Sequence, residues 1–196
     1  GVFIAQYFGK KNFEMIRRIL GKLVLAGITL SLIFSIITFI GAEKIIGIFT
    51  KEPQVLSIGV SYIRRALFSY TFYAISFSIG FCLRAMGLTR IPMISASIGV
   101  TANTFFNYCF IYGNLGFPRL EERGAALATV IARMLELLTI LFIVYKKNFN
   151  LKGNIQSYLN LPKNLIKEII KISTPVFLTE MLWILGVVSL SVAYSK

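Results

Sequence analysis

Long uncharged apolar runs alternate along the chain with short segments in which the charged residues gather. Three such runs carry no charge at all, 23–42, 66–83 and 91–118. Two more are interrupted only by a few charged residues, 124–145 by Arg133 and Glu136 and 172–195 by Glu180. A helix needs about 20 apolar residues to cross a hydrocarbon layer ~30 Å thick. The pattern therefore predicts five transmembrane helices rather than the shorter helices of a soluble core. The apolar start, Gly1–Phe8, reads as the end of a further span, and we expect the sequence to be a fragment of a longer one.

The distribution of charge predicts how these helices are oriented. The net charge of +13 could suggest nucleic-acid binding, but the basic residues are concentrated in alternate loops. The strongly basic loops are 9–22, 84–90 and 146–171, and the roughly neutral ones are 43–59 and 113–123. This is the positive-inside pattern, so we expect the basic loops to be cytoplasmic, the others external, and nucleic acid not to be a partner. Arg64 and Arg65 are the exception, and we expect them to extend to the outer surface.

The amino-acid composition excludes most types of catalytic site. Histidine and aspartate are absent, and the two cysteines, Cys82 and Cys109, lie in apolar runs. Without these residue types the usual zinc sites and the Ser-His-Asp triad are excluded. We therefore predict no metal site and no catalytic residue.

Two of the basic connections differ in character. Segment 9–22 is short and amphipathic, and we expect it to lie against the inner membrane surface. Segment 146–171 begins with a polar stretch and then becomes helical, with Lys163, Lys167 and Lys171 at four-residue spacing on one face. We interpret this second part as an interfacial helix that leads into the last apolar run, within a linker between two halves of a larger protein.

One carboxylate, Glu180, lies in the middle of the last apolar run. It lies ~13 Å beyond Lys171 along a helix, close to the midplane of the bilayer. A charge there costs at least ~3 kcal/mol, so we expect the carboxyl group to be protonated, paired with a cation or open to a water-filled cavity. Each state would make Glu180 respond to protons or ions; the alternative is a neutral structural hydrogen bond, for example to Arg133. Pro175 predicts a kink in the same helix.

Two further polar groups lie at membrane depth. Asn103 and Asn107 are four residues apart and share one helix face. Their amide oxygens can ligate Na⁺ or accept a hydrogen bond from a protonated acid, and the alternative is a pair of interhelical hydrogen bonds. Arg133 and Glu136 are three residues apart and face the same side, so we predict a structural ion pair.

Aromatic and small residues are concentrated in particular runs. The aromatic ones between 66 and 83 include Phe68, Tyr70, Phe72, Tyr73 and Phe77. They could line a cavity for flat cationic compounds through their ring faces, or simply pack against lipid and other helices. Small residues at 95–99 and 124–129 predict close contacts between helices.

Five stretches, in order, resemble the multidrug and toxic compound extrusion family of transporters. AQYFGKKN (5–12) is similar to the end of that family's second helix, and YIRRALFSYTF (62–72) and LRAMGLTRIPM (83–93) to its fourth helix and the following loop. NTFFNYCFIYGNLGFPRLEERGAALATVIARMLEL (103–137) resembles its fifth and sixth helices and is the most specific piece. STPVFLTEMLWILG (173–186) resembles the start of its seventh helix, so the resemblance covers essentially the whole chain.

The resemblance implies an all-α fold, a polytopic integral membrane helical bundle in which two six-helix lobes enclose a central cavity. Residues 1–145 would form most of the N-terminal lobe, from the end of its second helix to its sixth. Residues 146–171 would be the cytoplasmic linker between the lobes, and 172–196 the first helix of the C-terminal lobe. The whole protein would be a multi-pass protein of the plasma membrane, monomeric when full length.

The resemblance also implies a function and some of its residues. The function would be ion-coupled antiport, in which entry of Na⁺ or H⁺ drives export of small organic, often cationic, drugs or metabolites, with no cofactor besides that ion. Asn103 matches an asparagine of a first-lobe cation site, and Thr129 resembles another member of that site. Asn107 stands where one branch of the family has an aspartate, and an amide does not take up a proton, which excludes proton coupling through this position. Glu180 resembles the acid that other branches carry on the seventh helix.

Two alternatives to this function remain at the level of sequence. A flippase for lipid-linked oligosaccharides would share the fold but tends to carry more basic residues facing the cavity at depth, where only Arg133 lies here. An intramembrane enzyme would need a nucleophile with its base or a set of metal ligands. The composition makes that alternative the poorest, and we predict that the protein is not an enzyme.

Overall fold

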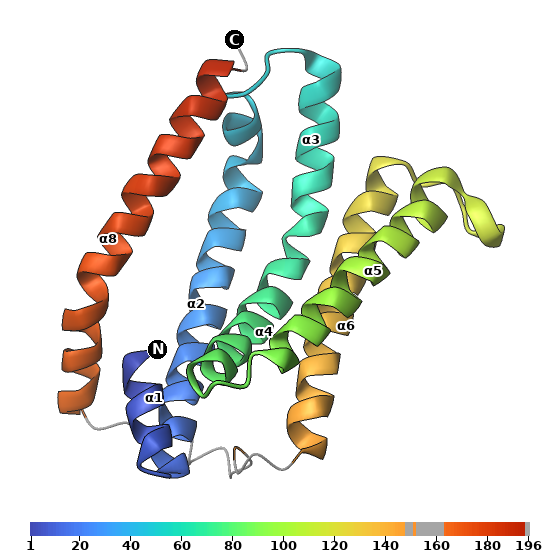
Figure 1. Ribbon diagram of the computed structural model, residues 1–196. Helices are drawn as coiled ribbons and strands as arrows, with labels where there is room; N and C mark the ends of the chain where they lie inside the picture. The colour runs from blue at the N-terminus through green and yellow to red at the C-terminus, as the bar shows by residue number, and fades with distance from the viewer. Residues whose placement is uncertain (148–150, 152–162, 195–196) are drawn as a thin grey trace.

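The computed structural model describes residues 1–147, 151 and 163–194, and every regular element among them is a helix (Figure 1). The elements are α1 (Val2–Gly9), α2 (Phe13–Ile46), α3 (Pro53–Ala66), α4 (Phe68–Ala85), α5 (Arg90–Tyr112), the short 3₁₀ helix η1 (Asn114–Gly116), α6 (Glu122–Lys146) and α8 (Lys163–Tyr194). The helices α1 to α6 form one bundle, and α8 packs against none of the other described helices. The predicted all-α class is confirmed.

Helix α2 begins earlier than the sequence predicts. The side chain of Asn12 caps it by accepting a hydrogen bond from the Met15 backbone N–H at 3.1 Å, and Glu14 lies in its first turn. The prediction of a separate amphipathic segment at 9–22 on the membrane surface is therefore wrong. Its apolar face, with Ile16 fully buried, packs into the core of the bundle instead.

The described helices agree with four of the five predicted spans. By length and apolar composition, α2, α6 and Thr174–Ser191 of α8 can each cross a membrane. Helices α3 and α4, taken together as one bent span, can form a fourth crossing. Helix α5 is not among them, since serine, threonine and asparagine dilute its apolar residues. Its 23 residues still reach ~35 Å. A crossing by α5 thus stays a prediction.

The bend of 47° between α3 and α4 has a local cause at Leu67. The Tyr70 N–H bonds to the carbonyl of Leu67 rather than to that of Ala66. The Ala66 carbonyl instead accepts a hydrogen bond from the buried Ser69 hydroxyl at 2.6 Å. A side-chain hydroxyl that takes the place of a backbone donor is a common reason for a helix to bend. Near this bend, Arg64 lies 3.7 Å from Glu43 and over the ring of Phe39, both on α2.

Helices α5 and α6 share the most extensive contact in the bundle, and small residues allow it. Ala126, Ala128 and Ala132 are all buried on the α6 side. Gly124 lies so close to α5 that a Cβ atom placed on it would be 2.7 Å from the carbonyl carbon and oxygen of Phe110. The predicted role of the small residues at 124–129 as a contact surface is thus confirmed.

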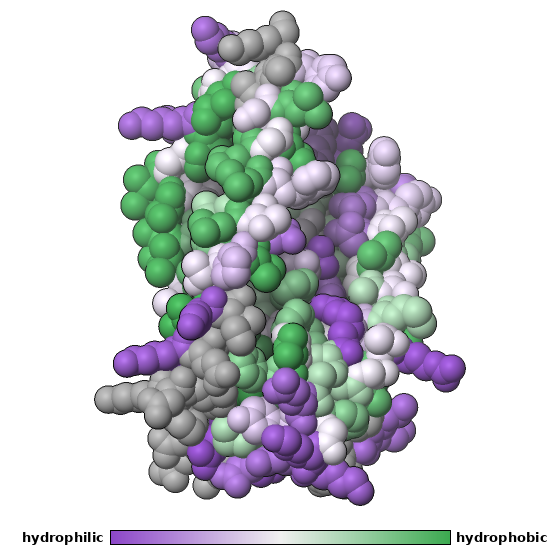
Figure 2. Space-filling model, turned by 60° about the vertical axis from the view of Figure 1, so that its left-hand side comes forward, coloured by the Kyte–Doolittle hydropathy of each residue, from purple (hydrophilic) through white to green (hydrophobic). Residues whose placement is uncertain are grey.

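One end of the bundle is both the best packed and the most basic. Its core combines residues of several helices with residues of the connections between them: Ile4, Ile16, Ile19, Leu20, Ile79, Cys82, Leu83, Met86, Ile91, Leu137, Ile140 and Leu151. Around this core, hydrophilic side chains cover the lower end of the molecule in Figure 2, where α1 and the last turn of α6 lie. The described parts of the loops predicted to be cytoplasmic therefore lie at the same end.

The predicted linker lies mostly outside the described residues. Its last part is visible, and Lys163–Lys171 forms the first turns of α8, which continues without interruption to Tyr194. The predicted boundary between 171 and 172 thus lies inside one helix. The assignment of the two sides to different lobes stays a prediction.

Candidate functional site

A chain of amide and hydroxyl groups connects α5 to α6 at the place where the sequence predicts an ion site. Asn107 Nδ2 donates to Asn103 Oδ1 at 3.1 Å, and Asn103 Nδ2 lies 3.5 Å from Thr129 Oγ1. The Thr129 hydroxyl donates to the carbonyl of Ala125 at 3.0 Å. The structure thus brings together three of the four residues predicted to bind the coupling ion. We call Asn103, Asn107 and Thr129 the amide cluster.

The position of the amide cluster follows from the local structure of both helices. A spacing of four residues stacks the two asparagines on one face of α5. That face meets the stretch of α6 where glycine and alanine allow the two backbones to approach closely. Thr129 then lies opposite Asn103, because it belongs to the same small-residue stretch.

One atom of the amide cluster is left without a partner. Asn107 Oδ1 is buried and finds no hydrogen-bond donor among the described residues. An unsatisfied buried polar atom costs about 1–3 kcal/mol, so such atoms usually mark a missing partner. A carbonyl-type oxygen can accept a hydrogen bond or ligate a hard cation. Asn107 is therefore the member of the cluster most suited to a ligand.

A second polar cluster lies at the middle of α6. Arg133 Nη1 donates to Glu136 Oε2 at 2.7 Å, so the predicted ion pair is present. The Arg133 guanidinium also lies over the ring of Tyr73 on α4, 4.6 Å from its centre. Arg133 follows the start of α6 by ~16 Å in a helix of ~37 Å. Half-buried charges at this depth must face protein or water, because hydrocarbon would not accept them.

Sequence reasoning missed one member of this second cluster. The charge pattern predicts Arg84 in the loop 84–90, but it belongs to the last turn of α4. Its guanidinium lies over the ring of Phe77, 5.6 Å from the ring centre. In the sequence, Tyr73 is one of several aromatic residues between 66 and 83. The stripe of Tyr73, Phe77, Gly80 and Arg84, at spacings of three and four, would have placed these residues on one helix face.

Glu180 is not brought near either cluster. It lies on α8, exposed, and that helix contacts none of the other described helices. The alternative of a structural hydrogen bond between Glu180 and Arg133 is not seen, since Arg133 donates to Glu136 instead. Pro175 lies inside α8, which remains one helix around it. A role for Glu180 in ion coupling stays a prediction.

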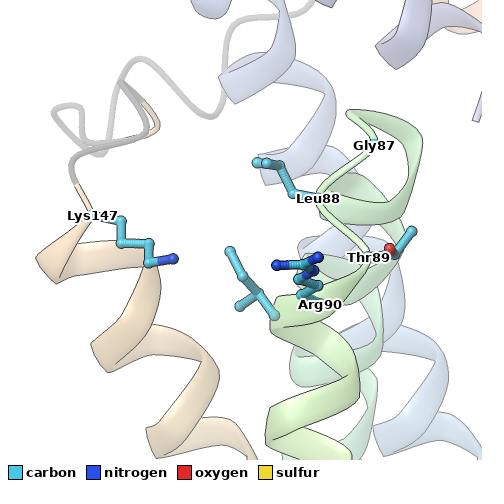
Figure 3. A pocket seen from close by; sticks show the side chains of 6 residues that line it. Gly87, Leu88, Thr89, Arg90 and Lys147 are labelled. Atoms are coloured by element: carbon cyan, nitrogen blue, oxygen red, sulfur yellow. The ribbon is translucent and has the colours of Figure 1, made fainter.

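A cavity of about 410 Å³ opens at the basic end between the α4–α5 loop and the end of α6. Arg90 and Lys147 point toward one another across it from α5 and from the residue after α6 (Figure 3). The described residues contain no group of three or more cysteines and glutamates that could hold a metal ion.

Apolar helices long enough to cross a bilayer, polar clusters between them and basic residues at one end define a multi-pass membrane protein. The chain belongs to the MatE family, whose model matches residues 1–109. This confirms the family predicted from the sequence and, with it, a location in the plasma membrane.

Named relatives match most of the chain. It is 28% identical over 189 residues to a probable multidrug resistance protein NorM of Thermotoga maritima, which covers 95% of the chain and 40% of that protein. A NorM of Listeria monocytogenes is 28% identical over 177 residues, 90% of the chain and 39% of that protein. The multidrug export protein MepA of Staphylococcus haemolyticus is 27% identical over 194 residues, 98% of the chain and 41% of that protein. The chain thus spans about two fifths of these relatives, which are named as drug resistance or export proteins and not as enzymes.

A solved structure shows the same fold. It is described as the inward-facing conformation of a multidrug resistance MATE family transporter of the MOP superfamily. The TM-score is 0.76 at 17% identity, over 88% of this chain and 38% of that one. The predicted helical membrane bundle is confirmed by this likeness.

Proposed function

We propose that the protein is an ion-coupled antiporter that exports small organic, often cationic, compounds by alternating access. The buried, unpartnered Oδ1 of Asn107 carries the ion-coupling part of this proposal. The names of the relatives support organic compounds as the cargo. The coupling ion is Na⁺ or H⁺, and the amide cluster itself suits a cation better than a proton, because amides and hydroxyls are not protonated at physiological pH.

Coupling follows if the ion and the cargo favour different states of the transporter. In this scheme a cation binds to Asn107 Oδ1 in the amide cluster, and α5 and α6 close around it. The cargo binds the state in which that oxygen is free. Glu180 would respond to the same ion from α8. The basic end of the bundle would face the cytoplasm, as the positive-inside pattern requires.

The protein expressed from its complete gene and reconstituted in liposomes tests the proposal. An inward Na⁺ or H⁺ gradient should drive movement of the cationic dye ethidium in the opposite direction, and collapse of that gradient should stop it. Scrambling of a fluorescent lipid without dye movement would favour the flippase instead. Dye movement that ignores both gradients would contradict coupling.

Replacing Asn107 by leucine should lower ion-driven dye movement by at least about tenfold, because the variant lacks the free oxygen and leaves Asn103 without its donor. Asn107→Asp keeps an oxygen at this position, so it should retain transport and make it more dependent on pH. The measurement is the initial rate of dye movement at several pH values. Thr104→Val is the matched control, since this residue of α5 is exposed and its hydroxyl donates to the Val100 carbonyl of the same helix. Equal rates for Asn107→Leu and the control would remove the cluster from coupling.

A further inference from the structure

The cavity of about 410 Å³ at the basic end of the bundle has two cationic side chains and no carboxylate in its described lining. Arg90 lies at the start of α5 and Lys147 directly after α6, and the two point toward one another across the cavity (Figure 3). Neither forms an ion pair with a described residue. Two like charges that face one space repel each other, and an anion between them would remove that repulsion. We call this cavity the basic pocket.

The turn between α4 and α5 holds Arg90 in this place. Gly87 has a φ of +77°, and Leu88 donates its backbone N–H to the Leu83 carbonyl at 2.9 Å, which closes the end of α4. The side chain of Leu88 packs against the core of the bundle. The carbonyls of Leu83 and Arg84 already accept backbone hydrogen bonds. The end of α4 therefore does not need the Arg90 guanidinium as a cap, and this charge is left to face the basic pocket.

The first turn of α5 lines the same pocket and favours an anion as well. Thr89, Arg90 and Ile91 belong to the lining, and no side chain caps this end of α5. The first N–H groups of a helix have no acceptor inside it and carry partial positive charge. These groups alone would not define a ligand. Here they share a cavity with two full charges, so three sources of positive potential face one space.

The neighbouring surface indicates that the anion belongs to a lipid. Leu141, Phe142 and Tyr145, on the last turns of α6, expose 43%, 64% and 69% of their surfaces. Helix α6 is apolar enough to cross a membrane, and Lys147 follows its last residue. The basic pocket therefore lies where hydrocarbon gives way to headgroups. A phospholipid can place its acyl chains on the exposed side chains and its phosphate in the pocket, whereas a free anion would make only the second contact.

We propose that the basic pocket binds the phosphate of an anionic phospholipid, with the guanidinium of Arg90 on two of its oxygens and the ammonium of Lys147 on one. The headgroup would join the α4–α5 turn to the end of α6. A zwitterionic lipid fits less well, because its choline or ethanolamine cation would face two like charges. The inference goes beyond the proposed function, since lipid binding here requires neither a coupling ion nor cargo.

Native mass spectrometry of the purified complete protein tests the proposal by counting the lipids bound to each molecule. Detergent-solubilised protein is titrated with dioleoylphosphatidylglycerol and, separately, with dioleoylphosphatidylcholine, which has the same acyl chains. The tightest binding step should be at least about tenfold tighter for the anionic lipid. Arg90→Gln and Lys147→Gln should each weaken that step by at least about tenfold. Arg90→Lys and Lys147→Arg keep the charge and should retain most of the affinity.

Lys146→Gln is the matched control, because it removes the same charge from the neighbouring residue. The ammonium of Lys146 lies outside the basic pocket, over the ring of Phe142 and 5.9 Å from its centre. Its loss should change the affinity for the anionic lipid by less than about twofold. The melting temperature of each variant is first compared with that of the parent protein without added lipid.

An equal loss of affinity in Lys146→Gln and Lys147→Gln would reveal only the general attraction of a basic surface, and it would overturn the proposal. Equal affinities for the two lipids would overturn it as well. Displacement of the lipid by an excess of glycerol 3-phosphate would make a soluble phosphate the occupant instead. Lipid binding through Arg90 and Lys147 in a protein that moves no dye would leave the basic pocket in place and contradict only the proposed function.

Discussion

Replacing Gly124 by alanine is expected to destabilise the protein by about 1–3 kcal/mol, as overpacking of a tight contact does. The added Cβ would lie 2.7 Å from backbone atoms of Phe110, and a backbone cannot move aside as a side chain end can. Helices α5 and α6 would have to separate along their shared face. Thermal unfolding of the purified complete protein should show a melting temperature lower by about 5 °C or more.

Gly41→Ala is the matched control for this substitution. Gly41 also lies inside a helix, but its Cβ would meet only the end of the Ile45 side chain, at an ordinary 3.7 Å. Its melting temperature should stay close to that of the parent protein. If Gly124→Ala and Gly41→Ala have the same melting temperature, then α5 and α6 do not pack as closely as the structure shows.

Replacing Glu180 by glutamine is expected to abolish ion-driven transport, with a loss of at least a hundredfold, on the order of 3 kcal/mol. Glutamine keeps the shape of the side chain but neither takes up a proton nor neutralises a cation. A carboxylate at mid-membrane depth is costly, so it is retained where ions interact with it. The measurement is the initial rate of dye movement under Na⁺ and H⁺ gradients applied separately.

Glu52→Gln removes a carboxylate of the same kind at an exposed position before α3, and its transport should match that of the parent protein. Comparable rates in Glu180→Gln and Glu52→Gln would exclude Glu180 from coupling. Loss under one gradient only would identify the ion that Glu180 senses.

Much of this fold could be predicted from the sequence, because a bilayer allows few solutions. Uncharged runs of membrane length have to be helices that satisfy their own backbone groups. Spacings of three and four residues on a helix fix which side chains meet, which is why the Arg133–Glu136 pair and the stacking of Asn103 on Asn107 could be predicted.

Other features depend on contacts between distant segments, and the sequence does not reveal these. An amphipathic segment such as 9–22 can pack on lipid or on protein. Here it packs on protein, because α1 and α4 lie beside it. The bend at Leu67 depends on the Ser69 hydroxyl, which donates a hydrogen bond to the Ala66 carbonyl. In a regular helix that carbonyl would accept from the backbone N–H of Tyr70. The contact of the Arg84 guanidinium with the face of the Phe77 ring likewise depends on a side-chain direction that the sequence does not give.

The absence of ionisable side chains from the amide cluster has an electrical consequence. Asn103, Asn107 and Thr129 offer a cation dipoles but no opposite charge. An ion held by them alone would carry its full elementary charge across the bilayer, and the membrane voltage would act on it with about 2.3 kcal/mol per 100 mV. An aspartate in place of Asn107 would cancel that charge, so this single amide would make the voltage itself a source of energy for the cycle.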